Sequence, residues 1–208
     1  MSTCHDRGLQ RKTGTVATDA AVPSAVVPDW SREKPTRFWD PGRRLLRSIR
    51  GYHLCRVRCG LVALVTSKWH VLAHRFWSVV TGADIPLTCQ IAGGLLLPHP
   101  NGVVIHPEAS IGPNCLIFQQ VTIGSGGKNA GLPVIGGHVD VGAGAKILGG
   151  IRIGDDAKIG ANAVVLCDVP AGMTAVGIPA RVIEQRLIVD TRNAMANVKG
   201  KREHIGKS

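Results

Sequence analysis

A six-residue repeat constrains the fold of this chain more than any other feature. Every sixth residue from residue 105, with one position missing between 123 and 135, gives eleven residues, of which ten are Ile or Val. The set is Ile105, Ile111, Ile117, Ile123, Ile135, Val141, Ile147, Ile153, Ile159, Val165 and Ala171. The residue four places later is always small or aliphatic, from Ala109 to Ala175, and Gly usually follows the aliphatic position.

A period of six matches neither the 3.6-residue period of an amphipathic helix nor the two-residue period of a strand. It is typical of short strands joined by turns, in which three repeats make one coil of about eighteen residues. We expect the glycines to supply positive φ angles at the corners. A flexible Gly-rich segment would not keep its apolar residues in phase over this length. The sequence therefore predicts a mostly β fold, a parallel β-helix of hexapeptide repeats.

Two interruptions of the repeat predict protruding segments. An earlier set, Ile85, Ile91, Leu97 and Val103, has the same step but slips by two residues before Ile105, and the text at the slip is PHPNG. The second interruption is the missing position between Ile123 and Ile135, where the text is GSGGKNAGLP. We expect both segments to be loops that leave the β-helix.

The flanks of the repeat differ from it in composition. Residues 1–35 mix Ser, Thr, Pro, Ala and charge without a period, so we expect them to be disordered. Residues 36–81 are predicted to form two or three helices, because apolar residues such as Leu45, Leu46 and Ile49 recur at helical spacing. The β-helix is expected over residues 82–183, and residues 184–208 form a C-terminal tail.

The positive charge lies outside the repeat. The net charge is +11, and residues 1–81 hold 14 Lys and Arg against 5 Asp and Glu. Such a flank suits nucleic acid, anionic lipid or a phosphorylated ligand, whereas a solvated helix face is the commoner use. No nucleic-acid motif accompanies the charge, so we expect no nucleic-acid partner. The longest apolar runs are too short to span a bilayer.

The cysteines and the N-terminus bear on the compartment. The six cysteines form no CxxC pair, and Cys115 falls at an inward repeat position, so we expect buried thiols in a reducing environment. The N-terminus is polar and charged from Cys4 onward and shows no signal-peptide pattern. The expected location is cytoplasmic.

His99 is the candidate catalytic residue, because it lies in PHPNG, where the repeat slips. A neutral imidazole is a suitable base for a hydroxyl group near neutral pH. Asp84 lies fifteen residues upstream, close to one coil length, so it is expected one coil below His99 and near it. A carboxylate there would fix the tautomer and orientation of the ring. A structural role for His99 is about equally compatible with these residues alone.

Two other candidate sites fit their motifs poorly. His106 and His138 fall at different places in the repeat from His99, so the three do not form a stacked column and we expect no metal site. GSGGK resembles a phosphate loop but lacks the first Gly, and Asn129 replaces Ser or Thr of that motif. A Gly-rich loop still offers backbone N–H groups to an extended cofactor.

The chain resembles the hexapeptide-repeat acyltransferases, and specifically the serine O-acetyltransferases. The resemblance covers residues 82–183 and is carried by TGADIP, LLLPHPNGVVI, FQQVTIGSGGK, VGAGAKILGGIRIG, AKIGANAVV and DVPAGMTAVGIPARVI. It implies a left-handed β-helix, a homotrimer, and acetyl-CoA bound in a groove between neighbouring chains. It also implies direct acetyl transfer without a metal, with His99 as general base and Asp84 as its orienting carboxylate.

The resemblance assigns further residues to the cofactor. The backbone at Ser125, Gly126, Ala143 and Ala161 would line the pantetheine arm, and Lys128, Lys158 and Arg181 would lie near the nucleotide phosphates. The acceptor pocket departs from the family. Pro98 replaces the Asp that usually precedes the catalytic His, and Gly131-Leu132-Pro133 replaces Arg-His-Pro in the protruding loop.

Three functions follow from these observations. The first is a serine O-acetyltransferase that forms O-acetylserine for cysteine biosynthesis, with serine held in another way. The second is an O-acetyltransferase of a sugar hydroxyl in polysaccharide or surface-glycan synthesis, which suits a less charged acceptor pocket. The third is a non-catalytic scaffold, and the presence of both Asp84 and His99 argues against it. We expect a simple trimer.

Overall fold

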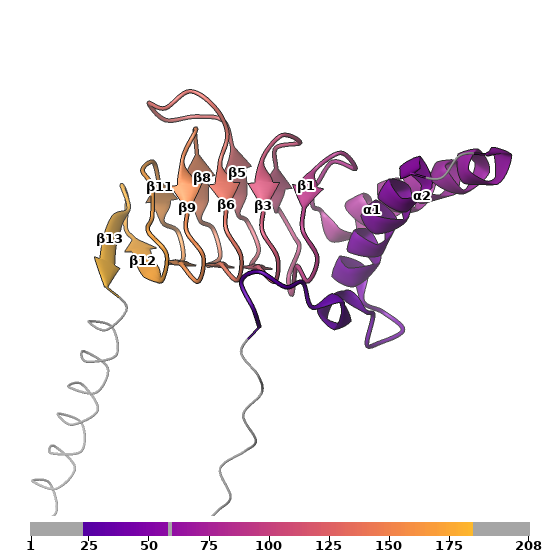
Figure 1. Ribbon diagram of the computed structural model, residues 1–208, viewed down its shortest axis with the longest axis horizontal. Coiled ribbons are helices and arrows are strands. Elements are labelled where there is room, and N and C mark those ends of the chain that lie inside the picture. Colours follow the sequence, from indigo (N-terminus) through magenta and orange to yellow (C-terminus); the bar gives the residue numbers. More distant parts are fainter. Residues whose placement is uncertain (1–22, 58–59, 185–208) are drawn as a thin grey trace, which may run out of the picture.

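The computed structural model describes residues 23–57 and 60–184, apart from the side chain of Leu61. Two helices precede a β-helix (Figure 1). The helical elements are η1 (Trp30–Glu33), α1 (Pro41–Val57) and α2 (Leu61–Thr81). The strands are β1 (Gln90–Ile91), β2 (Val104–Ile105), β3 (Ser110–Ile111), β4 (Leu116–Ile117), β5 (Thr122–Gly124), β6 (Val134–Ile135), β7 (Asp140–Val141), β8 (Lys146–Leu148), β9 (Arg152–Ile153), β10 (Lys158–Ile159), β11 (Val164–Val165), β12 (Met173–Val176) and β13 (Arg181–Glu184).

The strands form three sheets, which are the three faces of the β-helix. The first face has the order β11-β8-β5-β2, the second β1-β3-β6-β9, and the third β13-β12-β10-β7-β4. All pairs are parallel except β12 with β13. The predicted fold class is confirmed: a mostly β, left-handed β-helix follows a helical region.

The pairing register gives the length of each coil. Val104 pairs with Thr122, eighteen residues later, as the repeat predicts. Gln90 pairs with Ser110, twenty residues later, so the coil that contains PHPNG holds two extra residues. Ser110 pairs with Val134, twenty-four residues later, so the coil that contains GSGGKNAGLP holds six extra. Both predicted interruptions are confirmed.

The core consists of the predicted inward positions. All the aliphatic positions from Ile105 to Val165 are buried, as are the positions four residues later from Ala109 to Ala175, except Gly127 in the long loop after β5. Ala171 differs from the prediction because it is exposed. The last coil is shorter, with Lys158 pairing with Thr174 after sixteen residues, so the repeat loses its phase before residue 171.

The glycines that follow the aliphatic positions have a different role from the predicted one. Positive φ is found two or three residues later, at Asn114, Gln120 and Gly144 for example, and not at Gly112 or Gly142. A Cβ on Gly112 would lie 2.4 Å from the backbone of Gly136 in the next coil. Gly112, Gly136, Gly142 and Gly154 are needed because consecutive coils approach too closely there for a side chain, whereas Gly172 has the predicted positive φ.

The N-terminal segment and the helices pack on the first coils. Residues 24–32 follow one edge of the β-helix, where the buried Asn114 side chain donates hydrogen bonds to the carbonyls of Ser24 and Val27 and accepts one from Asp29 N–H. Residues 23–35 are therefore ordered, which corrects that part of the disorder expected for 1–35. Residues 1–22 and most of the expected tail, 185–208, lie outside the described residues. Helix α2 ends at Gly82, whose positive φ lets its N–H bond to Ser78 O.

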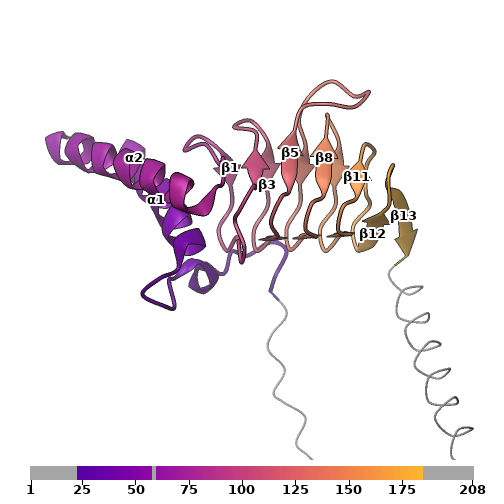
Figure 2. The same ribbon diagram turned by 180° about the vertical axis from the view of Figure 1, so that it is seen from behind.

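Figure 2 shows the helices from the other side, at the end of the β-helix where the first coil lies. Among the helices of the described residues, none is both long and apolar enough to cross a bilayer.

Candidate active site

The loop Pro98–Gly102 presents His99 to solvent from a rigid base. It lies between the buried residues Leu97 and Val103, on the edge that joins the third face to the first. We call this the His99 edge; it also contains the turns at 119–120, 143–144 and 161–162. Gly102, with a φ of 67°, donates its N–H to Gly82 O at 2.8 Å. The His99 side chain is exposed and makes no hydrogen bond to any described residue, so its ring nitrogens are available.

A second contact holds the His99 loop to the coil above it. The side-chain amide of Gln120 donates to Asn101 Oδ1 at 2.9 Å, and the backbone N–H of Gln120 donates to Asn101 O at 2.9 Å. A Cβ on Gly102 would lie 2.5 Å from that amide. Gly102 therefore allows both the turn and the stacking, and the loop is supported on two sides.

Asp84 lies one coil below the loop, at the start of the first face. Asp84 N–H donates to Val103 O at 2.8 Å, and Ile105 N–H donates to Asp84 O at 3.0 Å. Asp84 is thus in register with Val104, five residues after His99, and its side chain is exposed. No hydrogen bond or ion pair joins Asp84 to His99 within residues 23–57 and 60–184. The orienting bond between them stays a prediction.

A cavity of about 380 Å³ lies beside the His99 loop. One wall consists of Leu96, Leu97, Pro98 and Pro100, so the chain neighbours of His99 line the cavity and His99 itself does not. The other wall is the segment from Thr36 to Arg43, which contributes Arg37, Trp39 and Asp40. No function was predicted for residues 36–43 from the sequence. No local pattern marks them as a site, because they approach the His99 loop only through the packing of α1 on the first coil.

The cavity wall carries an ionised carboxylate beside a guanidinium. Asp40 caps the start of α1, and its Oδ2 accepts hydrogen bonds from Arg43 at 2.9 Å and from Thr36 N–H at 3.3 Å. Burial opposes ionisation of Asp40, but the bonds from Arg43 and Thr36 outweigh it and lower the pKa of this carboxyl. The cavity can therefore offer both a negative and a positive group to a small polar molecule.

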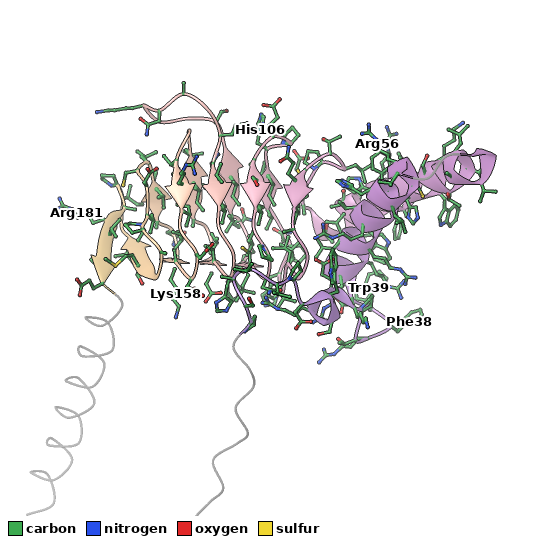
Figure 3. All side chains as sticks on the ribbon, viewed as in Figure 1. Phe38, Trp39, Arg56, His106, Lys158 and Arg181 are labelled. Carbon is green, nitrogen blue, oxygen red and sulfur yellow. The ribbon has the colours of Figure 1, made fainter. Side chains whose placement is uncertain are left out.

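The residues assigned to the cofactor do not gather in one place on a single chain. Ala143 and Ala161 stack in successive turns of the His99 edge. Ser125, Gly126 and Lys128 lie in the loop between β5 and β6, on the edge that joins the first face to the second, which we call the long-loop edge. Lys158 points outward from the third face, and Arg181 lies on β13 at the far end of the β-helix (Figure 3).

The histidines expected not to share a metal occupy three different edges. His99 is on the His99 edge, His106 follows β2 on the long-loop edge, and His138 is in the turn between β6 and β7. His138 Nδ1 lies 2.7 Å from Asp156 Oδ1, one coil away. Over the described part of the chain, no three His, Cys, Asp or Glu side chains are grouped as a metal site would require.

The cysteines are only partly as predicted. Cys89 and Cys115 are buried free thiols, whereas Cys55 is half-buried and Cys167 is exposed. Burial, together with the negative charge of Asp84, raises the pKa of Cys89 to about 12. Burial raises the pKa of Cys115 to about 11. Cys4 and Cys59 lie outside the described residues.

The chain has the fold of the hexapeptide-repeat transferases, a left-handed β-helix, and a histidine loop lies where its repeat slips. The chain is 39% identical over 155 residues to the serine acetyltransferase of Staphylococcus xylosus, covering 70% of this chain and 72% of that protein. The chain belongs to the serine acetyltransferase family. It spans less than half the length of several other curated family members that it matches. No protein-family model matches the chain.

Solved structures agree with this membership. Soybean serine acetyltransferase in complex with serine superposes with a TM-score of 0.58 at 39% identity, over 69% of this chain and 57% of the soybean chain. A serine acetyltransferase in complex with CoA superposes with a TM-score of 0.58 at 33% identity, over 70% of this chain and 58% of that chain.

Proposed function

We propose that this chain is an acetyl-CoA-dependent O-acetyltransferase whose acceptor is the hydroxyl group of serine. The observation that carries the proposal is the cavity beside the His99 loop, in which Pro98 and Pro100, the neighbours of the exposed His99, face Arg37, Asp40 and Arg43. Membership of the serine acetyltransferase family, and relatives solved with serine and with CoA, support the same reading.

In the proposed reaction, His99 acts as a general base in direct transfer. The serine hydroxyl gives its proton to His99 as its oxygen attacks the carbonyl carbon of the thioester. The tetrahedral intermediate then loses the C–S bond, and the departing sulfur of CoA takes the proton from His99. Binding both substrates side by side supplies much of the rate acceleration. No metal ion takes part in any of these steps.

Asp84 is the proposed positioning residue for His99. Its place on the adjacent coil, in register with Val104, supports this role. Both side chains are exposed and free of other hydrogen bonds to described residues, and we propose that they form this bond when substrate binds. Such bonds are often long or absent in a free enzyme and tighten in its complexes.

We propose a homotrimer in which acetyl-CoA lies between neighbouring chains. The division of the cofactor residues between two edges supports this arrangement. The long-loop edge of one chain, with Ser125, Gly126 and Lys128, would face the His99 edge of the next, with Ala143 and Ala161. Lys158 and Arg181 are then candidates for the nucleotide phosphates. Backbone N–H groups of the loop would stabilise the oxyanion.

The charged wall of the cavity replaces the serine-binding groups that are missing at Pro98, Gly131 and Leu132. Asp40 would take the ammonium group of serine, and Arg37 would take its carboxylate. Charge-assisted hydrogen bonds of this kind are about twice as strong as neutral ones. Both charges of the serine zwitterion would then have a partner, which matters because a buried charge without a partner is costly.

A sugar hydroxyl is the second candidate acceptor. The cavity, at about 380 Å³, exceeds the need of a serine molecule, and the exposed ring of Trp39 lies on its wall. An exposed indole offers a flat surface on which the apolar face of a sugar ring can pack. This alternative would place the chain in polysaccharide or surface-glycan synthesis.

Release of free thiol from acetyl-CoA distinguishes the two acceptors. We expect millimolar serine to accelerate release strongly, with homoserine and a panel of sugars acting weakly. Acceleration by a sugar alone would support the alternative, and no acceleration by serine would remove the first proposal. The proposed location is the cytoplasm, which suits the free thiols Cys55, Cys89, Cys115 and Cys167.

A further inference from the structure

Helix α2 carries an exposed apolar stripe along its full length. The stripe consists of six residues at alternating spacings of three and four, namely Val62, Val65, Trp69, Leu72, Phe76 and Val79. Each of these side chains is between 55% and 84% exposed. This spacing keeps the residues on one side of a helix, so the stripe is a continuous surface.

The opposite side of α2 is already occupied. Ala63, Thr66 and His70 line a shared cavity with Gly51 and Cys55 of α1. Ala73 and Trp77 line another with Arg44 and Ser48 of α1. Val62 and Trp69 of the stripe lie at the rims of these two cavities, and the other four stripe residues line neither. All six remain more than half exposed, so the described residues leave most of the stripe uncovered.

The apolar surface continues around the tip of the α1–α2 hairpin. Leu54 and Val57 at the end of α1 and Leu64 at the start of α2 are all more than half exposed. The hairpin projects from the first-coil end of the β-helix, with this tip farthest out (Figures 1 and 2). A flat partner can contact the tip and the stripe, whereas one straight helix lying on the stripe leaves the tip bare.

The charge around this surface has one sign. Residues 41–57 and 60–81 contain seven Arg and Lys and neither Asp nor Glu: Arg43, Arg44, Arg47, Arg50, Arg56, Lys68 and Arg75. Lys68 and Arg75 each precede an aromatic residue of the stripe and lie two turns apart, so both flank the stripe on the same side. Neither makes an ion pair with a described residue.

We propose that the stripe and the hairpin tip dock this protein onto the surface of an anionic lipid bilayer. The apolar side chains would enter the region between headgroups and acyl chains, and Arg56, Lys68 and Arg75 would pair with lipid phosphates. An amphipathic helix with aromatic residues on one face and only basic charge beside it is typical of such binding.

A second copy of α2 fits the stripe less well. It would bring another Lys68 and Arg75 to the contact, and neither hairpin holds a carboxylate to offset them. Trp69 and Phe76 are also bulky for a close helix–helix seam, whereas aromatic rings suit a membrane interface.

The test is flotation of the full chain with vesicles. One set is phosphatidylcholine alone, and the other contains about 30% phosphatidylglycerol at physiological salt. We expect the bound fraction on the anionic vesicles to be at least about tenfold higher, because headgroup charge and apolar burial act together. Trp69→Glu with Phe76→Glu should lower that binding at least about tenfold.

Two further variants complete the test. Val26→Glu replaces an equally exposed apolar residue outside the hairpin and should leave binding unchanged. Lys68→Glu with Arg75→Glu keeps the stripe but reverses its flanking charge, and it should abolish the preference for anionic vesicles.

Three results would overturn the proposal. The first is no vesicle binding by the unaltered chain. The second is vesicle binding that the stripe variants retain. Salt-sensitive binding to duplex DNA, with no binding to vesicles, counts as the same result. The third is a native mass of the Trp69→Glu, Phe76→Glu variant below that of the unaltered chain, when the unaltered chain binds no vesicles. That result would assign the stripe to contacts between copies of the chain.

Discussion

The guanidinium of Arg50 donates two hydrogen bonds to the carboxylate of Glu33, at 2.9 and 3.0 Å. Glu33 is buried and also accepts the backbone N–H groups of Gly94 and Leu95, at 2.8 and 3.1 Å. Arg50 additionally donates to Ala92 O at 2.7 Å and lies over the ring of Trp30. This pair joins the N-terminal segment, α1 and the first coil, so it holds the cavity wall at residues 36–43 against the His99 loop.

Removal of Glu33 should destabilise the protein strongly. Glu33→Ala leaves the Arg50 guanidinium without its partner in a mostly buried place, and such losses cost about 3–5 kcal/mol. The matched control is Asp156→Asn, which removes the exposed carboxylate charge that pairs with His138, tolerates the positive φ of this residue, and should cost less than about 1 kcal/mol. Urea unfolding measures both. Equal effects of the two variants would show that the buried pair does not fix the helices to the β-helix.

His99→Ala should reduce acetyl transfer by about 10²- to 10⁴-fold, the usual contribution of a general base. The thermal midpoint should not change, because His99 is exposed and bonds to no described residue. His138→Ala is the matched control on another edge and should retain turnover. Asp84→Asn should lower kcat while leaving KM for acetyl-CoA unchanged. Turnover of His99→Ala close to that of the unaltered chain would exclude His99 as the base.

Asp40→Asn should raise KM for serine by about tenfold to a hundredfold, the range expected when a hydrogen bond to a charged group is lost. Asn also caps helices well, so the start of α1 should persist. KM for acetyl-CoA serves as the internal control. An unchanged KM for serine would place the ammonium group elsewhere.

The lowered pKa of Asp40 also predicts a pH dependence. The carboxylate is ionised above its ordinary pKa of 3.8 and remains so until the pH falls through the lower value. The contribution of Asp40 to serine binding should therefore be constant between pH 5 and 8 and decline only below about pH 4. The measurement is KM for serine at each pH, corrected for the ionisation of serine. A decline near pH 5 to 6 that disappears in Asp40→Asn would contradict this.

Thiol reactivity should follow burial. Because the pKa values of Cys89 and Cys115 are about 12 and about 11, both thiols stay protonated at pH 8 and become thiolates only at higher pH. Alkylation by iodoacetamide at pH 8, resolved by peptide mass spectrometry, should be more than about a hundredfold slower at these two than at Cys167. Urea should remove the difference. Early labelling of Cys115 in the folded chain would show that the coil opens locally.

The repeat was sufficient to predict the core. An aliphatic side chain every six residues has one stable solution, and the buried set from Ile105 to Val165 matches it. The predicted role of the glycines was wrong, because one repeat does not show how closely the coils approach each other. A Cβ on Gly112 would lie only 2.4 Å from the backbone of Gly136 in the next coil. The phase at Ala171 failed because the last coil shortens to sixteen residues.

The site was harder to predict than the core. The slip of the repeat predicted the exposed loop that carries His99, whereas the catalytic roles of His99 and Asp84 stay predictions. The cavity wall formed by Arg37, Trp39 and Asp40 was not predicted, since these residues lie in a segment without a period and are brought to Pro98 and Pro100 only by long-range packing. Residues 23–35 were expected to be disordered for the same reason. Their order depends on Asn114 and on the Glu33–Arg50 pair, which are tertiary contacts.

The most direct test of the account is mass spectrometry of the product formed from serine and isotope-labelled acetyl-CoA. The unaltered chain should produce labelled O-acetylserine with one free CoA thiol per product molecule, and the His99→Ala chain should produce almost none. Absence of O-acetylserine with the unaltered chain, or equal amounts from both chains, would contradict the central claim that His99 activates a serine hydroxyl for attack on the thioester.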